Sequence, residues 1–117
     1  MDLVVREYDQ GGVPVLSLAG EVDLATVPRL RDRLVRAAAE HPATTVLVDL
    51  DGVTLIDSAG LGILVGGLRR MRATGGGLAL VCSSPRLTEV LTAVGLDRVF
   101  DIHPTVAGGA GVVRNGR

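Results

Sequence analysis

Ser58 is the residue of this chain whose type and surroundings best suit a chemical modification. It lies in the run Asp57–Gly62 (Asp-Ser-Ala-Gly-Leu-Gly), where a predicted strand gives way to a predicted helix. A serine at a helix start either caps the helix through its hydroxyl oxygen or accepts a phosphate, which the unpaired backbone N–H groups there would hold. The phosphate would carry a charge of about −1.5 to −2 at neutral pH, and the Asp57 carboxylate would repel it. Phosphorylation would therefore change the local charge without unfolding the domain.

Two further carboxylates, Asp49 and Asp51, follow a Val-rich stretch. The run Val46–Asp57 resembles the first motif of haloacid-dehalogenase-type phosphatases, in which the first Asp is the nucleophile and the second the acid/base. Paired carboxylates at a strand end suit Mg²⁺ binding and attack on phosphorus. The sequence has no Lys to neutralise an aspartyl-phosphate and no downstream acidic pair. We therefore expect no enzymatic activity and keep the phosphatase as a remote alternative to a loop-capping role for both residues.

Other reactive arrangements lack essential parts. A serine-nucleophile elbow needs Gly two residues before the serine, and position 56 is Ile. Cys82 is the only cysteine, which excludes an internal disulfide and a cysteine-rich zinc cluster. His41 and His103 are expected at the surface, and the glycines at 75–77 lack the Lys that follows in a phosphate-binding loop. We expect neither a metal nor a cofactor.

The elements that must position these residues alternate between strands and helices. β-Branched apolar runs predict strands, and helical periodicity with capping residues predicts helices. The predicted strands are Leu3–Tyr8, Val13–Ala19, Thr44–Leu50, Leu78–Cys82 and Val99–Ile102, and the predicted helices are 27–41, Ser58–Ala73 and 85–94. This order predicts one α/β domain with a mixed, mostly parallel sheet of four or five strands and three or four helices. The N-terminal strand is expected to be antiparallel at an edge.

The predicted domain covers residues 1–106, and a glycine-rich C-terminal tail follows at 107–117. Glycine costs a helix about 1 kcal/mol against alanine, so we expect a frayed short helix or disorder in the tail. Thr26 is the expected N-cap of the first helix. In the third helix, an apolar face is expected from Leu87, Val90, Leu91 and Val94.

The helix predicted at Ser58–Ala73 has two apolar faces. At about 100° per residue, its core face comprises Leu61, Leu64, Val65, Leu68 and Met71, and the opposite face comprises Ala59, Gly62, Ile63, Gly66 and Arg70. Exposed helix faces usually carry Glu and Lys, whereas this second face is small, apolar and basic. Its small residues either pack closely against another helix of the domain or form a flat docking surface for a partner.

The composition narrows the classes of partner. Basic and acidic residues nearly balance, at 12 and 13 with a formal net charge of −1, and aromatics make up 2% of the chain. Nucleic-acid binding and attachment to anionic membranes both rely on an excess of positive charge, and base stacking relies on aromatic rings. We expect binding to neither nucleic acid nor membrane. With no apolar run near the roughly 20 residues of a membrane span, a cytoplasmic protein is expected.

Three segments together resemble a known family. The run Asp57–Gly62 resembles the signature of bacterial anti-sigma factor antagonists, the STAS-domain family. Upstream, Leu18–Asp23 (Leu-Ala-Gly-Glu-Val-Asp) is similar to that family's strand end before the first helix, and Val94–Phe100 is similar to its apolar-Gly-Leu turn before the last strand. The resemblance extends from about Leu3 to Ile102.

The resemblance implies a partner-switching role. In that family the unphosphorylated protein binds an anti-sigma factor that is also a serine kinase, which releases the sigma factor, and phosphorylation by the kinase ends the complex. By position the phosphorylated serine is Ser58, ATP would belong to the kinase, and a phosphoserine phosphatase would reverse the step. Together with the outer face of the Ser58–Ala73 helix, the resemblance predicts these partner-binding residues: Glu21, Asp23, Asp57, Ser58, Ala59, Gly60, Leu61, Gly62, Ile63, Gly66 and Arg70. An alternative within the same fold is a non-enzymatic adaptor in a transporter or a stress-signalling assembly.

Overall fold

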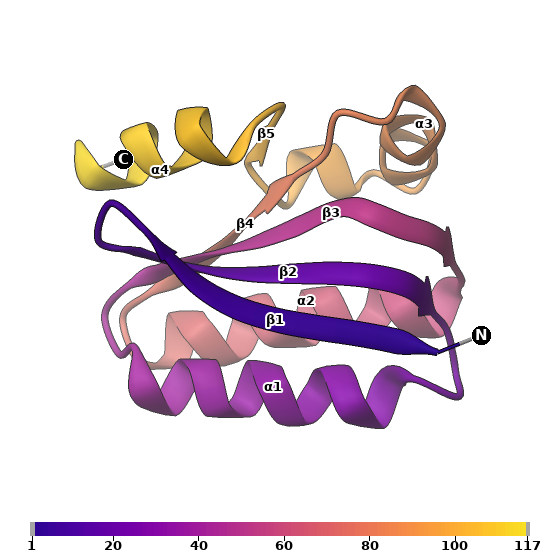
Figure 1. Cartoon of the computed structure of the whole chain (residues 1–117), viewed down its shortest axis with the longest axis horizontal. Coiled ribbons are helices and arrows are strands. Elements are labelled where there is room, and N and C mark those ends of the chain that lie inside the picture. Colours follow the sequence, from indigo (N-terminus) through magenta and orange to yellow (C-terminus); the bar gives the residue numbers. More distant parts are fainter. Residues whose placement is uncertain (1, 117) are drawn as a thin grey trace.

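The computed structural model describes residues 2–116 as a five-stranded mixed sheet with helices on both faces (Figure 1). The strands are β1 (Leu3–Gln10), β2 (Val13–Val22), β3 (Thr45–Ile56), β4 (Gly77–Val81) and β5 (Ile102–His103). The helices are α1 (Val27–Glu40), α2 (Ser58–Ala73), α3 (Pro85–Ala93), the 3₁₀ turn η1 (Leu96–Arg98) and α4 (Val106–Arg114). The strand order follows the chain, with β1 antiparallel to β2 and the other neighbours parallel. The predicted α/β fold with an antiparallel N-terminal edge strand is confirmed.

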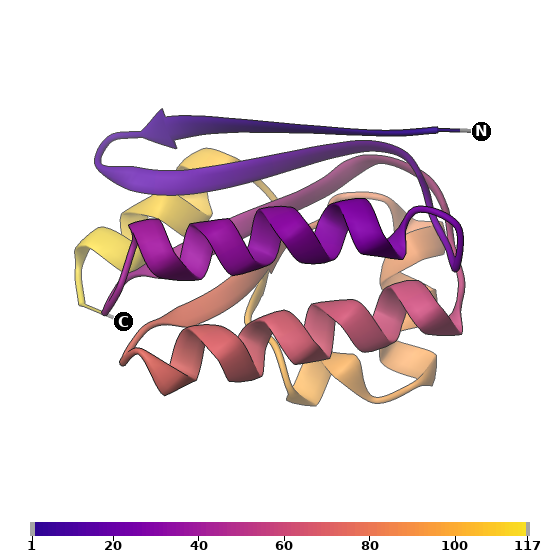
Figure 2. The ribbon, with the colours of Figure 1, turned by 90° about the horizontal axis from the view of Figure 1, so that it is seen from below.

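The sheet separates two hydrophobic cores. The larger core contains buried side chains of α1, α2 and α3, and it meets one face of β2, β3 and β4. The smaller core lies on the opposite face, where Ala110 of α4 packs against Val15, Leu47 and Ala79. Viewed from below, α1 and α2 run side by side beneath the strands (Figure 2). The parallel connections that lead into α1 and α2 place the N-terminal ends of both helices at the same edge of the sheet.

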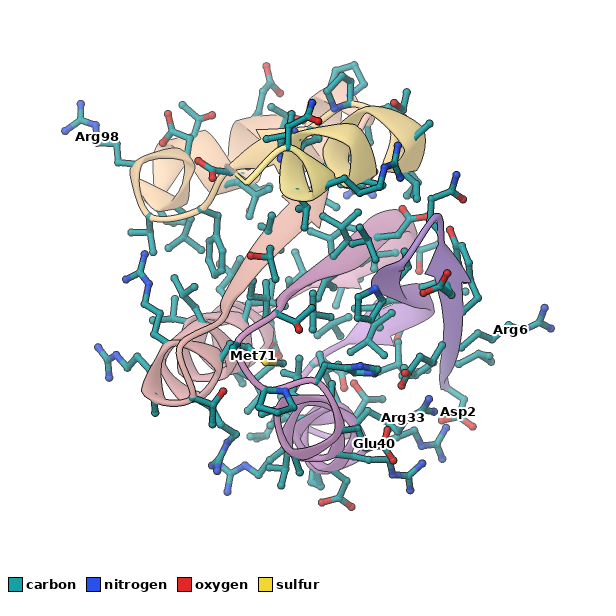
Figure 3. The ribbon with its side chains drawn as sticks, turned by 90° about the vertical axis from the view of Figure 1, so that its left-hand side faces the viewer. Asp2, Arg6, Arg33, Glu40, Met71 and Arg98 are labelled. Carbon is teal, nitrogen blue, oxygen red and sulfur yellow. The ribbon has the colours of Figure 1, made fainter. Side chains whose placement is uncertain are left out.

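Glycine sets the spacing between α1 and α2. A Cβ built on Gly67 would lie 3.0 Å from Leu34 of α1 and 3.2 Å from Leu78 of β4. The end-on view shows both helices below the sheet, with the labelled Met71 on the inner side of α2 and the labelled Arg98 and Arg6 pointing outward (Figure 3). Met71 is 1% exposed. The helix pair is therefore closely packed, and α2 also packs against β4.

The strand β3 is longer than predicted. The predicted strand ends at Leu50, whereas pairing with β2 continues to Ile56 through two register shifts between the strands. Gly52 makes this possible, because a Cβ there would lie 2.6 Å from the carbonyl oxygen of Leu18. Such a close approach of neighbouring strands is typical of glycine at an irregular position. The extension brings the end of β3 directly to Asp57.

Two local predictions in the C-terminal half are corrected. Val94 follows α3 and is 55% exposed, so it does not belong to the buried face. The predicted strand Val99–Ile102 is largely replaced by η1 and the turn after it, and β5 begins only at Ile102. α3 ends at Ala93, and Gly95, with a φ of +80°, turns the chain into η1.

The glycine-rich tail forms a capped helix rather than a disordered segment. The Thr105 side chain accepts a hydrogen bond from the Gly108 N–H at 3.0 Å and so caps α4. Gly109 faces the ring of His103, which a Cβ would approach to 3.2 Å, and Ala110 is fully buried. Tertiary packing and the cap thus offset the low helix propensity of glycine. Within residues 2–116, none of the helices is long and apolar enough to cross a membrane.

Candidate functional site

The Ser58 region is built where two parallel strands end side by side. Glu21 and Val22 of β2 lie opposite Leu55 and Ile56 of β3. The N–H of Asp57 extends this pairing by donating to the Val22 carbonyl at 3.1 Å. Because parallel strands bring their carboxyl ends to one edge of the sheet, the loop from β2 to α1 and the start of α2 become neighbours.

Asp57, and not Ser58, caps α2. Its Oδ1 accepts a hydrogen bond from the Gly60 N–H at 2.9 Å, with an extended backbone at Asp57 and helical geometry from Ser58 onward. The interpretation of Ser58 as the N-cap is therefore wrong. Ser58 is exposed, and its hydroxyl makes no hydrogen bond to any other residue within 2–116. The hydroxyl is thus both accessible and chemically uncommitted.

The same carboxylate reaches across to the loop before α1. The second oxygen of Asp57, Oδ2, accepts from the Leu24 N–H at 3.2 Å. Asp23 folds the rest of that loop, since its Oδ1 accepts from the N–H groups of Ala25 at 3.0 Å and Thr26 at 3.1 Å. Two carboxylates thus define a short, fully hydrogen-bonded loop beside Ser58.

Thr26 braces this loop from inside. It is 7% exposed and occupies the N-cap position of α1, but its side chain makes no capping bond to the helix. Its hydroxyl instead donates to the Glu21 carbonyl at 2.8 Å and accepts from the Asp23 N–H at 3.0 Å. The predicted capping role of Thr26 is replaced by a link between the end of β2 and the loop.

The predicted site residues fall into two groups. Glu21, Asp23, Asp57 and Ser58 meet at one edge of the sheet, as the family resemblance implies. Gly60 is buried, and a Cβ there would lie 2.5 Å from the Val22 carbonyl oxygen and 2.9 Å from an Ile56 side-chain carbon. The contribution of Gly60 is therefore to let α2 approach the strand ends, which fixes the position of Ser58.

The remaining predicted residues lie along α2. Ala59, Leu61 and Ile63 are half-buried, whereas Gly62 and Arg70 are exposed. Of the predicted core face, Leu64, Leu68 and Met71 are buried, but Leu61 and Val65 are only partly covered. The prediction of which side of α2 faces the core is thus correct, but the fully buried face of the helix is narrower than predicted.

The glycines of α2 differ in their surroundings. Gly67 provides the close helix packing described above, whereas a Cβ on Gly62 or Gly66 would meet no atom within 4 Å. Gly66 also borders a shallow groove between α1 and α2, whose lining consists of Arg31, Leu34, Ile63, Gly66, Gly67 and Arg70. The side of α2 that carries Ser58, Gly62 and Gly66, which we call the outer strip, is therefore open at its two glycines.

Sequence reasoning did not single out Leu24. This leucine is 76% exposed, the highest value among the exposed large hydrophobic side chains of residues 2–116. The one sequence feature that could have pointed to it is an apolar residue between Asp23 and Ala25. In the structure, the Asp23 side chain of this loop accepts hydrogen bonds from the loop's own backbone N–H groups. Neither helical nor strand periodicity assigns a role to such a residue.

The Asp49–Asp51 pair is engaged in the structure of the sheet. Asp51 Oδ1 accepts from both the N–H and the hydroxyl of Ser83, at 2.7 and 3.1 Å, which ties β3 to the end of β4. Asp49 Oδ1 accepts from the Asp51 N–H at 3.0 Å. Burial and the nearby charge of Asp49 raise the pKa of Tyr8 above its usual value. Both carboxylates lie within β3, although the strand predicted to end at Leu50 left Asp51 in the loop after it.

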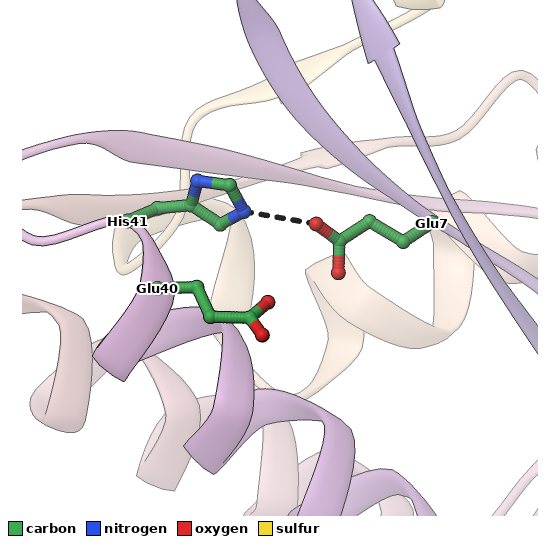
Figure 4. Close-up of side chains that lie close together, drawn as sticks. All are labelled: Glu7, Glu40 and His41. Atoms are coloured by element: carbon green, nitrogen blue, oxygen red, sulfur yellow. Dashed lines mark hydrogen bonds and ion pairs between the residues drawn. The ribbon is translucent and has the colours of Figure 1, made fainter.

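A second polar cluster lies at the other end of α1. Glu7 Oε2 and His41 Nε2 are 2.8 Å apart, and Glu40 lies beside them (Figure 4). One ligand atom from each of the three lies within 4.8 Å of the others. Carboxylate and imidazole groups are ligands for zinc. Glu7 and Glu40 are exposed and His41 is half-buried, and the Glu7–His41 hydrogen bond explains the cluster as a link between β1 and the end of α1.

Comparisons with known proteins agree on one family. A model of the STAS domain matches residues 5–109. The chain is 34% identical over 94 residues to the anti-sigma-B factor antagonist of Bacillus subtilis, which covers 80% of this chain and 84% of that protein. It is 30% identical over 115 residues to the anti-sigma-F factor antagonist RsfB of Mycobacterium tuberculosis, covering 98% and 93%. The crystal structure of an anti-sigma factor antagonist from Mycobacterium paratuberculosis matches with a TM-score of 0.86 at 28% identity, covering 97% of this chain and 95% of that one.

Proposed function

The chain belongs to the STAS-domain family of anti-sigma factor antagonists, and we propose that phosphorylation of Ser58 controls its binding to an anti-sigma factor. In this proposal the unphosphorylated protein binds an anti-sigma factor with serine kinase activity and thereby releases the sigma factor. Phosphorylation of Ser58 by that kinase, with ATP held by the kinase, ends the complex, and a phosphoserine phosphatase restores binding. We expect these steps in the cytoplasm and assign no catalysis to this chain.

One observation carries the proposal: the Ser58 hydroxyl is exposed and unbonded at the first position of α2, next to an aspartate that already caps the helix. A kinase can reach such a hydroxyl without breaking any contact of the fold. The added phosphate could itself accept hydrogen bonds from the N–H groups at the start of α2, so the helix would remain formed even if Asp57 shifted. The chemical change would therefore be confined to the surface that the partner contacts.

Charge explains how the modification would act. Ser58 lies beside the carboxylates of Asp57 and Asp23, and a phosphate adds about −1.5 to −2 at neutral pH. A partner surface that matches the unmodified site must then either desolvate the new charge or meet it with its own acids. An uncompensated charge in an interface typically costs several kcal/mol. At about 1.4 kcal/mol per tenfold change in affinity, a cost of about 3 kcal/mol weakens binding roughly a hundredfold.

The proposed docking surface joins the Ser58 edge to the outer strip of α2. Glu21 and Asp23 form its acidic end, followed along the helix by Gly62 and Gly66 and then by Arg70. The absence of side chains at Gly62 and Gly66 lets a partner approach the helix backbone closely. An acidic end and a basic end on one surface would also fix the orientation of a partner with the opposite arrangement of charges.

The test begins with phosphorylation. The protein is incubated with ATP and each anti-sigma kinase encoded in its own genome, and the modified residue is mapped by mass spectrometry. Ser58→Ala should bind the phosphorylating partner as the wild type does and resist modification, and Ser58→Asp should bind at least tenfold more weakly in calorimetry. Thr92→Asp, an acidic change at an exposed position of α3, is the matched control and should bind normally. Equal affinity of Ser58→Ala and Ser58→Asp would refute the switch.

A further inference from the structure

Leu24 is an apolar side chain that the fold holds out into solvent. It is 76% exposed, although full burial of a leucine would favour folding by about 1.5–3 kcal/mol, and it lies beside the proposed phosphorylation site. Single exposed leucines are common on protein surfaces. The position of this one is unusual because its backbone is fixed by the aspartate that precedes Ser58.

The loop that carries Leu24 is ordered by its own hydrogen bonds. The N–H groups of three consecutive residues, Leu24, Ala25 and Thr26, all donate to carboxylates, two of them to Asp23 and one to Asp57. The buried Thr26 hydroxyl joins the loop to the end of β2. A side chain presented by such a loop loses little backbone freedom on binding, which is the condition for an efficient anchor residue.

The charged groups around Leu24 indicate which kind of partner surface could cover it. Carboxylates of Asp23 and Asp57 flank it, so an apolar side chain projects from an acidic rim. Anchor residues at interfaces are typically surrounded by polar contacts that exclude water. The complementary surface is an apolar pocket bordered by Arg or Lys side chains. Because Leu24 adjoins Ser58, this pocket would belong to the same partner that reads Ser58.

We propose that Leu24 is the apolar anchor for the anti-sigma factor, inserting into a base-rimmed apolar pocket, and that Asp57 couples its position to the phosphorylation state of Ser58. This inference rests on the proposed function and names the contact that phosphorylation weakens. The anchor is held through Asp57 Oδ2, while Oδ1 of the same group caps α2.

The coupling follows from the shared carboxylate. A phosphate on Ser58 would be attracted to the N–H groups at the start of α2, for which Asp57 Oδ1 already competes. It would also repel the Asp57 carboxylate by like charge. Both effects displace Asp57, and the Leu24 N–H then loses its acceptor. Phosphorylation would therefore loosen the anchor as well as change the charge of the surface.

The anchor is tested with Leu24→Ala and with Val94→Ala as the matched control, since Val94 is 55% exposed at the end of α3. Calorimetric titration with the anti-sigma kinase that modifies Ser58 should show tenfold to hundredfold weaker binding for Leu24→Ala and no change for Val94→Ala. Both variants should keep the wild-type melting temperature. If Leu24→Ala binds like the wild type, the anchor is refuted while the proposed function stands. If the wild type binds no such kinase, the proposed function fails together with the anchor.

The coupling has a separate readout that needs no partner. Amide hydrogen exchange of Leu24, followed by NMR, should be slow in the wild type and at least tenfold faster after Ser58 phosphorylation. Asp57→Asn should accelerate it likewise, because asparagine is a good N-cap but offers a single acceptor oxygen where Asp57 uses two. Unchanged exchange at Leu24 in the phosphorylated protein would overturn the coupling and leave the anchor to the binding experiment.

Discussion

Replacing Gly66 of α2 by alanine should stabilise this protein, whereas the same replacement at Gly60 should destabilise it. Both residues are helical, so the change in intrinsic propensity has the same sign at the two positions. Their surroundings differ. A Cβ on Gly66 would meet no atom within 4 Å, while a Cβ on Gly60 would lie 2.5 Å from the Val22 carbonyl oxygen and 2.8 Å from a Val22 side-chain carbon.

The magnitudes follow from these distances. In a helix interior alanine is favoured over glycine by about 1 kcal/mol, and nothing opposes that gain at Gly66. At Gly60 the contact partner is backbone, which cannot rotate away, so α2 must move from the end of β2. Such overpacking costs about 1–3 kcal/mol, and the propensity gain offsets only part of it. We expect Gly66→Ala to raise the free energy of unfolding by up to about 1 kcal/mol and Gly60→Ala to lower it by about 1–2 kcal/mol.

Urea denaturation followed by circular dichroism measures both changes, and a shift of 1 kcal/mol corresponds to roughly 4 °C in melting temperature for a domain of this size. Gly62→Ala is a second control, because its Cβ would also meet no atom within 4 Å. If Gly60→Ala is as stable as the wild type, the close approach of α2 to β2 is not what positions Ser58. If Gly66→Ala is destabilising, α2 is packed differently at its outer strip.

Two further predictions concern ionisation and capping. Tyr8 should titrate above pH 10, because burial and then the charge of Asp49 raise its pKa, and Asp49→Asn should lower the midpoint. The phenolate absorbance reports this directly, since Tyr8 is the only tyrosine and the chain has no Trp. A raised folded-state pKa means that this contribution to stability is complete below the unfolded pKa of about 10 and is lost as pH rises through the folded value. Asp57→Ala should lower the free energy of unfolding by about 0.5–2 kcal/mol, whereas Ser58→Ala should stay within about 0.5 kcal/mol in the same urea assay; equal losses would contradict the assignment of the cap.

Local sequence signals predicted the elements whose ends are marked by capping or breaking residues. The bounds predicted for α2, Ser58–Ala73, agree with the structure because Asp57 and Ser58 mark its start and glycines follow its end. The start of α3 was predicted for the same reason, and Ser84 accepts the expected hydrogen bond from the Leu87 N–H. The directions of the strands followed from the alternation of strands and helices.

Features that depend on contacts between distant segments could not be predicted in this way. The continuation of β3 past Gly52 depends on a close approach to Leu18, which no local pattern reveals. The helix α4 forms although its glycines disfavour it, because Gly109 fits against His103 and Ala110 fills the smaller core. In both cases glycine was interpreted as a break, and the structure uses its small size for packing.

The site shows the same division between local and distant information. Ser58 could be found from its neighbours, but the partition of roles between Ser58 and Asp57 could not, since either side chain is chemically able to cap a helix. Contact with β2 determines which of the two residues caps the helix. The carbonyl of Val22, the last residue of β2, accepts from the Asp57 N–H, and the Asp57 carboxylate then accepts from the N–H groups of Gly60 and Leu24. Because Asp57 caps α2, the Ser58 hydroxyl is not needed for capping. A serine at this position can therefore gain and lose a phosphate while the helix that presents it remains intact.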